Sequence, residues 1–178
     1  SAIGIYGVGE ESMSEDSPIG RGFLAELCEA WEKQADRAEV LGIRTIKLRT
    51  GLVLSRAGGL LAKSGPAVLG SGRQWMSWIH IDDVVSFILF ALEHANISGP
   101  FNLTAPNPVT NSEFTQTLAR QRKMPFTIRV PSFVLRAALG ELSEAILASQ
   151  RVLPERALDH GFKFRHERLK DALAHIYS

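Results

Sequence analysis

The sequence has one cysteine, no long apolar run and almost no net charge, and each of these absences excludes a class of protein. With Cys28 alone the chain cannot form an internal disulfide, which fits a reducing cytoplasm better than a secreted scaffold. No apolar run approaches the roughly 18 residues that a membrane span needs. The net charge of +1 provides no bulk field toward nucleic acid or anionic lipid. We expect a small-molecule substrate as partner, and neither nucleic acid nor a membrane.

Signatures of metal sites and of nucleophilic hydrolases are also missing. The five histidines, at positions 80, 94, 160, 166 and 175, form no ligand pair backed by cysteine, so we predict no metal site. The chain has no G-x-S-x-G sequence, and Cys28 lies within an apolar stripe. Both features argue against a serine or cysteine nucleophile.

What is present predicts an α/β domain. Of the 178 residues, 45% are hydrophobic and 22% charged, which is a normal globular balance. Apolar residues spaced by 3.6 predict a helix over 22–41 that ends at Gly42, and capping and spacing predict further helices over 82–95 and 110–121. Branched residues predict strands over 43–55, interrupted at Gly51, and over 101–104. This alternation indicates an α/β fold with parallel strands.

The second part of the chain has a different pattern. We predict helices over 132–149, 154–160 and 165–176, and strand character only in FKFR, residues 162–165. The loop-rich TAPNPVTN, residues 104–111, is the only linker of its kind. We therefore predict a sheet domain over 1–105 and a small, mostly helical domain over 106–178, with a chain that crosses back over the boundary left open.

Two strand ends are candidates for a ligand site. SAIGIYG, residues 1–7, has the pattern of a buried strand that runs into a glycine turn, and LRTGLVLS, residues 48–55, has the same form. Open α/β sheets bind ligands at the carboxyl ends of their strands. Tight turns after core strands would also explain both segments. Two such ends in one sheet favour a shared crevice.

The stretch GSGRQWMSWIHIDD, residues 70–83, is the densest in polar and aromatic residues. One interpretation places Arg73 and Gln74 against a ligand phosphate or hydroxyl at the domain junction. The other packs Trp75 and Trp78 between the domains and leaves Arg73 and Gln74 solvated. The sequence alone favours neither.

Other polar residues have simpler explanations. We expect His80 to be a satisfied core residue rather than a general base, and Asp82 or Asp83 to cap a helix rather than to form a catalytic carboxylate pair. The basic segment RQRKMPFTIR, residues 120–129, fits the carboxyl end of a helix better than a nucleic-acid patch.

Seven segments taken together resemble one family. They are SAIGIYG, EDSP, FLAELCEAWE, LRTGLVLS, GSGRQWMSWIHIDD, FNLTAPNPVTNSEFT and QRVLPERALDHGFKF. In order and nearly end to end, they resemble the epimerase-like branch of the atypical extended short-chain dehydrogenases/reductases, also described as nucleoside-diphosphate-sugar epimerases. The resemblance implies the carboxyl part of a Rossmann-like, doubly wound parallel sheet and a small, mostly helical C-terminal domain of unassigned role.

The resemblance also implies a cofactor, NADP(H) or NAD(H), with a lean toward NADP(H). No G-x-x-G-x-x-G occurs, and SAIGIYG resembles the fifth strand of that fold. The expectation is therefore a carboxyl half without the strands that hold adenosine and pyrophosphate. The loop between GGLLAK and GSGRQ is shorter than is usual in the family. The cofactor-binding residues implied are Ala2, Gly4, Arg49, Thr50, Gly51, Leu52 and Val53.

The usual catalytic pair is absent from the expected positions. Extended reductases use a Tyr and a Lys four residues later on the helix after the fifth strand. Phe23 and Leu27 stand at these positions, and the family shares this absence. The resemblance makes Tyr6 the best substitute acid/base, with packing of its ring as the alternative, and places Ser1, or equally Ala2, at the usual Ser/Thr position. The implied substrate-side residues are Arg73, Gln74 and Trp75.

Three functions remain open from the sequence. The first is an NAD(P)-dependent epimerase or oxidoreductase that acts on a nucleotide sugar or similar polar substrate. The second is a non-catalytic dinucleotide-binding or interaction module. The third is a half-domain that exposes an apolar sheet edge and associates into a homo-oligomer.

Overall fold

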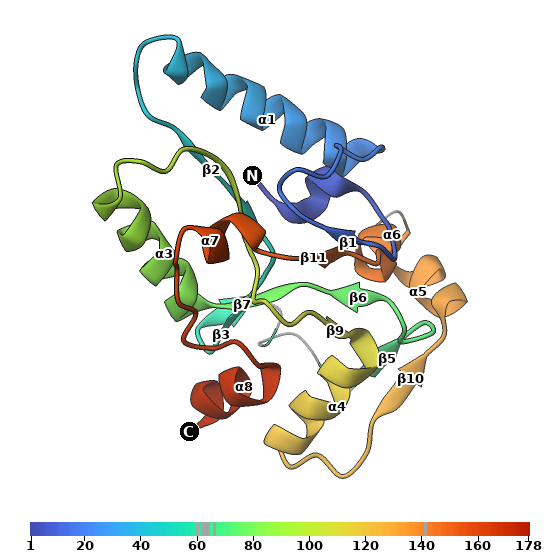
Figure 1. Cartoon of the computed structure of the whole chain (residues 1–178). Helices are drawn as coiled ribbons and strands as arrows, with labels where there is room; N and C mark the ends of the chain where they lie inside the picture. The colour runs from blue at the N-terminus through green and yellow to red at the C-terminus, as the bar shows by residue number, and fades with distance from the viewer. Residues whose placement is uncertain (60, 62–64, 66, 141) are drawn as a thin grey trace.

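The computed structural model describes residues 1–59, 61, 65, 67–140 and 142–178, in which helices alternate with short strands (Figure 1). The helices are the 3₁₀ turn η1 (Ile3–Tyr6), α1 (Phe23–Glu39), α3 (Ile81–Glu93), α4 (Asn111–Gln121), α5 (Ser132–Leu139), α6 (Leu142–Leu147), α7 (Glu155–Asp159) and α8 (Leu169–Tyr177). The strands are β1 (Ser12–Met13), β2 (Ile46–Thr50), β3 (Leu52–Ser55), β4 (Gly58–Gly59), β5 (Ala67–Leu69), β6 (Trp75–Met76), β7 (Trp78–His80), β8 (Gly99–Leu103), β9 (Val109–Thr110), β10 (Ile128–Val130) and β11 (Arg151–Val152). The predicted α/β class is confirmed.

Most strand pairs are parallel, as the alternation predicts. β2 pairs with β8 in parallel, and β3 pairs with β7 in parallel. β1 with β11 and β5 with β10 are parallel as well, whereas β3 with β4 and β6 with β9 are antiparallel. Strands β9, β10 and β11 therefore return to strands that lie before residue 105. The division at residues 105 and 106 stays a prediction. Three strand pairings connect residues on its two sides.

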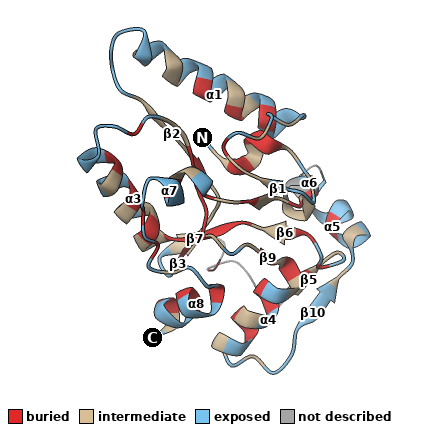
Figure 2. Ribbon diagram, viewed as in Figure 1, coloured by how far each residue is buried: buried red, intermediate tan, exposed pale blue. Residues whose placement is uncertain are grey.

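Two apolar clusters hold the strands and helices together (Figure 2). Trp78, which is fully buried, belongs to the cluster that joins β3 and β7 to α4 and α8. Phe87 belongs to the cluster that joins α3 to β8 and to the segment around Phe162 and Phe164. A smaller cluster packs the η1 turn against Val152. The strand ends near η1 are therefore anchored from several sides.

The predicted helices form, except that the one helix predicted over 132–149 is two, α5 and α6, with Gly140 at a φ of 54° after α5. One predicted cap is also corrected. Gly42 follows α1 with a φ of 76°, and the Thr110 hydroxyl accepts a hydrogen bond from the Glu113 N–H at 3.2 Å, both as expected. The prediction that Asp82 or Asp83 caps α3 is wrong. His80 is the cap, because its Nδ1 accepts the Asp82 N–H at 3.0 Å. Burial, with a contribution from His166, lowers the pKa of His80, which favours this neutral ring.

Two segments predicted as strands are not strands. FKFR, residues 162–165, forms none, because the Arg165 N–H donates to the Asp83 carboxylate instead of to a neighbouring strand. SAIGIYG forms a single bridge at Ala2 and then the η1 turn, in which the Ile5 and Gly7 N–H groups donate back three residues. The turn lies against α1, where a Cβ on Gly4 would make an ordinary contact with Leu24 Cβ at 3.4 Å.

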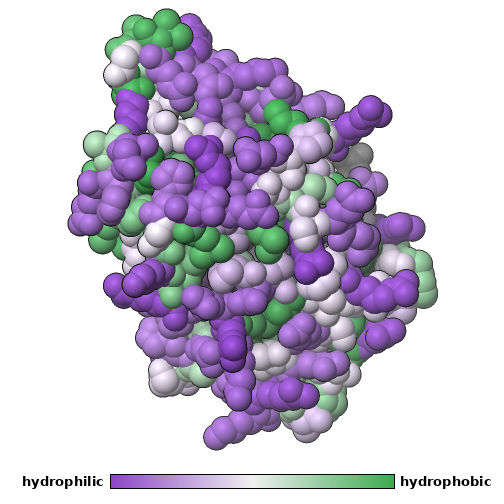
Figure 3. All heavy atoms as spheres, viewed as in Figure 1, coloured by the Kyte–Doolittle hydropathy of each residue, from purple (hydrophilic) through white to green (hydrophobic). Residues whose placement is uncertain are grey.

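Parts of two helices expose apolar side chains. Within the apolar stripe of α1, Cys28 is buried, whereas Phe23 is 76% and Trp31 54% exposed. The outer face of α3 exposes Val85, Ile88, Leu89 and Leu92. Figure 3 shows green atoms at the top of the molecule, over the turn after α1, where Val40 and Leu41 are exposed. Within the described residues, no helix has the length and hydropathy that a membrane crossing requires.

Candidate functional site

The two candidate segments touch at one point, although SAIGIYG is not a strand. Ala2 forms a parallel bridge with Thr50, and the Thr50 N–H donates to the Ser1 carbonyl at 3.4 Å. Ala2, Gly4 and Thr50 are small and half-buried. The fold thus brings the predicted cofactor residues of both segments to one edge.

Gly51 lies where three strands approach closely. Its N–H donates to the Leu103 carbonyl at 3.0 Å. A Cβ on Gly51 would stand 2.6 Å from the Ser77 carbonyl oxygen and 2.9 Å from Thr104 Cγ2. Packing therefore requires glycine at this position, whatever it binds. The cofactor-binding role of Gly51, and of Leu52 and Val53 after it, stays a prediction.

Replacing Gly51 by alanine is expected to lower the free energy of unfolding by about 1–3 kcal/mol or more, because the new methyl group collides with backbone atoms that cannot move independently. Gly58→Ala is the matched control, since a Cβ at Gly58 meets nothing within 4 Å. Urea denaturation of both variants measures the difference. Equal losses in the two variants would contradict the close approach.

A buried ion pair lies directly under this edge. Arg49 and Glu32 make two hydrogen bonds, from Nε to Oε1 and from Nη2 to Oε2, each at 2.9 Å. Arg49 is 6% and Glu32 8% exposed. The Ser1 hydroxyl donates to Glu32 Oε1 at 2.7 Å. Burial raises the pKa of Glu32, but the bonds from Arg49 and Ser1 outweigh it, and the pKa is lowered overall.

Tyr6 joins the same network from the other side. Its hydroxyl accepts from Arg49 Nη1 at 2.8 Å and donates to Asn102 Oδ1 at 2.7 Å. The Asn102 N–H donates to Glu15 Oε1 at 2.8 Å, and the Arg156 N–H donates to Glu15 Oε2 at 3.3 Å. The result is a chain of polar contacts that links the η1 turn, β2 and β8.

Burial raises the pKa of the Tyr6 phenol more than the Arg49 and Asn102 hydrogen bonds lower it. Tyr6 therefore keeps its proton at neutral pH, and that proton is directed to Asn102. Burial raises the pKa of the Glu15 carboxyl as well. The catalytic roles predicted for Tyr6 and Ser1 stay predictions. The geometry gives the Tyr6 hydroxyl a second function, as a link between Arg49 and Asn102.

The predicted substrate-side residues divide between surface and interior. Arg73 is exposed, whereas Gln74 is 6% exposed and its Nε2 donates to the Leu69 carbonyl at 3.0 Å. The Arg151 guanidinium lies 4.6 Å from the centre of the Trp75 ring. The alternative in which Gln74 is solvated is therefore wrong, and the substrate-binding role of the three residues stays a prediction.

Gln150 is a residue of this junction that sequence reasoning missed. Its Nε2 donates to the Gly7 carbonyl at 2.6 Å, and its backbone N–H donates to the Trp75 carbonyl at 3.1 Å. It therefore connects the chain at the end of the η1 turn to β6. No local pattern signals this role, because both contacts depend on β11 returning to the first part of the chain.

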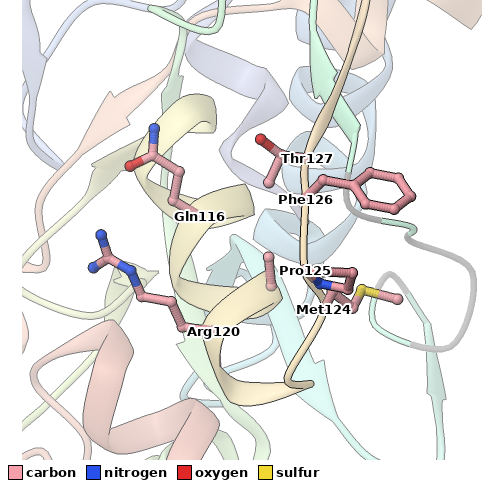
Figure 4. Close-up of a pocket in the computed structure, with 7 residues that line it drawn as sticks. Gln116, Arg120, Met124, Pro125, Phe126 and Thr127 are labelled. Atoms are coloured by element: carbon pink, nitrogen blue, oxygen red, sulfur yellow. The ribbon is translucent and has the colours of Figure 1, made fainter.

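Two shallow hollows differ in their relation to this network. One, of about 270 Å³, opens beside Ser1 and Glu32, between α1 and β2, and is lined further by Trp31, Ala35, Ile46, Lys47 and Leu48. The other, of about 250 Å³, lies between α4 and residues 124–127 (Figure 4). There Gln116 and Arg120 extend from α4 to one side and Phe126 to the other, so their side chains do not converge. The hollow beside Ser1 is the one next to the candidate site.

Comparisons with known proteins relate this chain to one family. Residues 26–104 match the NAD dependent epimerase/dehydratase family, and residues 130–176 match DUF1731, a domain of unknown function. The epimerase family protein YfhF of Bacillus subtilis is 42% identical over 184 residues, which is 99% of this chain and 61% of YfhF. The chain therefore spans about three fifths of the length of this curated relative.

Solved structures of relatives superpose on nearly the whole chain. The crystal structure of human epimerase family protein SDR39U1, isoform 2, with NADPH matches 99% of this chain and 63% of its own, with a TM-score of 0.89 and 31% identity. The nucleoside-diphosphate sugar epimerase from Corynebacterium glutamicum matches 99% of this chain and 36% of its own, with a TM-score of 0.80 and 34% identity.

Proposed function

This chain belongs to the epimerase family, in which an NAD-dependent epimerase/dehydratase region precedes DUF1731, and on that basis we propose that it forms part of a protein that binds NADP(H). Residues 1–105 then correspond to the carboxyl part of a Rossmann-like, doubly wound sheet, and residues 106–178 to a small α-rich domain on the substrate side. The observation that carries the proposal is the match, at a TM-score of 0.89, to a human relative solved with NADPH.

The residues at the strand ends suit the nicotinamide end of such a cofactor. Ala2 and Gly4 are small residues, Ala2 is bridged to Thr50, and the Arg49–Glu32 pair holds this edge from beneath. When bound, a nicotinamide supplies or accepts a hydride. The chain itself would position the ring and exclude water from one side of it.

For the reaction we propose oxidoreduction or epimerisation of a nucleotide sugar or similar polar substrate. The substrate class rests on the Corynebacterium relative, which is described as a nucleoside-diphosphate sugar epimerase. Arg73 and Trp75 would contact the substrate, and Tyr6 with Ser1 would move the proton. A homo-oligomer and a cytoplasmic location stay predictions.

The second candidate is a dinucleotide-binding protein without turnover. Two observations favour it. Phe23, at the position of the usual catalytic Tyr, is 76% exposed and has no proton to donate. The Tyr6 hydroxyl already donates to Asn102 inside the protein. Dinucleotide binding would then serve to sense the cofactor or to support a partner protein.

Calorimetric titration with NADPH tests both candidates. A chimera of this chain with the region of Bacillus subtilis YfhF that it does not cover is expected to bind NADPH with a micromolar or lower Kd, equivalent to about −8 kcal/mol or better. Tyr6→Phe is expected to leave that Kd within threefold. Tyr177→Phe is the matched control, because Tyr177 also accepts from an arginine, Arg122, but lies in α8.

The outcomes separate the candidates. No binding of NADPH or NADH by the chimera would overturn the dinucleotide proposal. Binding with hydride transfer that falls at least tenfold in Tyr6→Phe, but not in Tyr177→Phe, would support the enzyme. Binding without turnover on nucleotide sugars would support the second candidate.

A further inference from the structure

Four metal-ligating side chains from three separate segments meet at the amino end of α3. His80 and Asp82 flank the start of that helix, His166 lies between α7 and α8, and His175 lies in α8. One ligand atom of each lies within 4.8 Å of the others. Imidazole nitrogens and a carboxylate oxygen are ligands that Zn²⁺ prefers. We infer that Asp82, His166 and His175 form a Zn²⁺ site, where the sequence predicted none; no residue of this site is among those predicted to bind the cofactor.

Buried contacts fix the backbone positions that carry His166 and His175. Asp83, which is fully buried, accepts the backbone N–H groups of Arg165 at 2.7 Å and His166 at 3.0 Å. These two bonds hold His166 beside the first turn of α3. Leu173 and Ile176 of α8 are buried in the core, which fixes the turn of that helix that carries His175.

The distances fit a site that a small adjustment would close. Asp82 Oδ2 lies 3.9 Å from His175 Nδ1 and 4.0 Å from His166 Nε2. Neighbouring ligand atoms around tetrahedral Zn²⁺, with bonds of about 2.0–2.2 Å, lie about 3.3–3.5 Å apart. The Asp82 and His175 side chains are 42% and 57% exposed, so both are free to make the shift of about half an ångström that these two separations require.

His80 stands behind the ligands rather than among them. Its Nδ1 accepts the Asp82 N–H, so the neutral ring carries its proton on Nε2 and donates it to His175 Nδ1 at 3.4 Å, a hydrogen bond that Zn²⁺ bound at His175 Nδ1 would replace. A protonated ring nitrogen has no lone pair for a metal. The His80 ring instead packs on His166, with centroids 4.0 Å apart, and supports its orientation.

Three protein ligands leave one tetrahedral position free. Because Asp82 and His175 are partly exposed, water can occupy that position, as it does in zinc sites with an open coordination place. The Asp82 carboxylate also offsets the positive amino end of the α3 dipole, which would otherwise disfavour a cation. The site is therefore open to solvent, and a bound Zn²⁺ can exchange with Zn²⁺ in solution.

Titration of the 178-residue chain with ZnCl₂ tests the inference without any cofactor. We expect one equivalent to bind with a micromolar or lower Kd, and the thermal midpoint to rise with Zn²⁺ and return with EDTA. His175→Asn and Asp82→Asn are each expected to weaken binding at least tenfold. His94→Asn is the matched control, since His94 is exposed and packs on Phe90 away from the cluster.

Circular dichroism of each variant first establishes that it is folded. Wild-type binding that is lost in both cluster variants and kept in His94→Asn would support the site. Absence of one-to-one binding in the wild type, or equal affinity in all four proteins, would overturn it. Equal affinity would mean that Zn²⁺ binds to scattered surface groups.

Discussion

Replacing Glu32 by glutamine is expected to lower the free energy of unfolding by about 3–5 kcal/mol, because it leaves the buried Arg49 guanidinium without its counter-charge. Arg49 is 6% exposed and makes two bonds to this carboxylate, each at 2.9 Å. Urea denaturation measures the loss. Glu29→Gln is the matched control, since Glu29 pairs with Lys33 on the exposed face of the same helix, and its loss should stay below about 1 kcal/mol.

A double variant separates the charge from the packing. Replacing Glu32 by leucine and Arg49 by methionine removes both charges, and the combined loss should be smaller than the sum of the two single losses. Additive losses would contradict a coupled pair. Losses of similar size in Glu32→Gln and Glu29→Gln would mean that the pair contributes no more than a surface contact.

The pH dependence of stability provides an independent check on Glu32. Its pKa is lower in the folded state than in the unfolded chain. The unfolded state therefore binds the proton more tightly, so the stabilisation is present above the unfolded pKa of about 4.3 and is lost as the pH falls below it. Burial raises the pKa of Glu15, so the contribution of Glu15 to the pH dependence of stability has the opposite sign. That contribution is present in both the wild type and Glu32→Gln. The difference between wild type and Glu32→Gln should consequently shrink in acid.

Replacing Asp83 by alanine is expected to cost roughly 2–6 kcal/mol, because two backbone donors lose their acceptor at about 1–3 kcal/mol each. The N–H groups of Arg165 and His166 donate to the two oxygens of this fully buried carboxylate. Chemical denaturation gives the loss of stability, and hydrogen exchange at these two amides shows whether they are released.

Asp82→Ala is the matched control for Asp83→Ala. Asp82 is the preceding residue on α3, and its side chain is 42% exposed, so its loss should stay within about 0.5 kcal/mol. Unchanged exchange at Arg165 and His166 in the Asp83→Ala chain would contradict the proposed anchoring of this segment.

The sequence alone determined the local elements and the family. Helix α1 follows from 3.6-residue periodicity, the start of α4 follows from the Thr110 and Glu113 capping box, and the cap at Gly42 follows from its neighbours in the chain. The break at Gly51 also appears where the sequence predicts it. Each of these features depends on residues a few positions apart, so a single segment contains the whole signal. The sequence also identified the epimerase family, through the order of the motifs along the chain.

Only the tertiary structure decided which polar groups meet. Tyr6 and Asn102 lie 96 positions apart, and His80 and His175 lie 95 apart, so no spacing rule connects them. The same limit explains the errors. The alternating Phe162 and Phe164 fit a strand, but both side chains enter one core, and the Arg165 N–H binds Asp83 instead of a strand. A segment shows its own periodicity, whereas its hydrogen-bond partner is set by what packs against it.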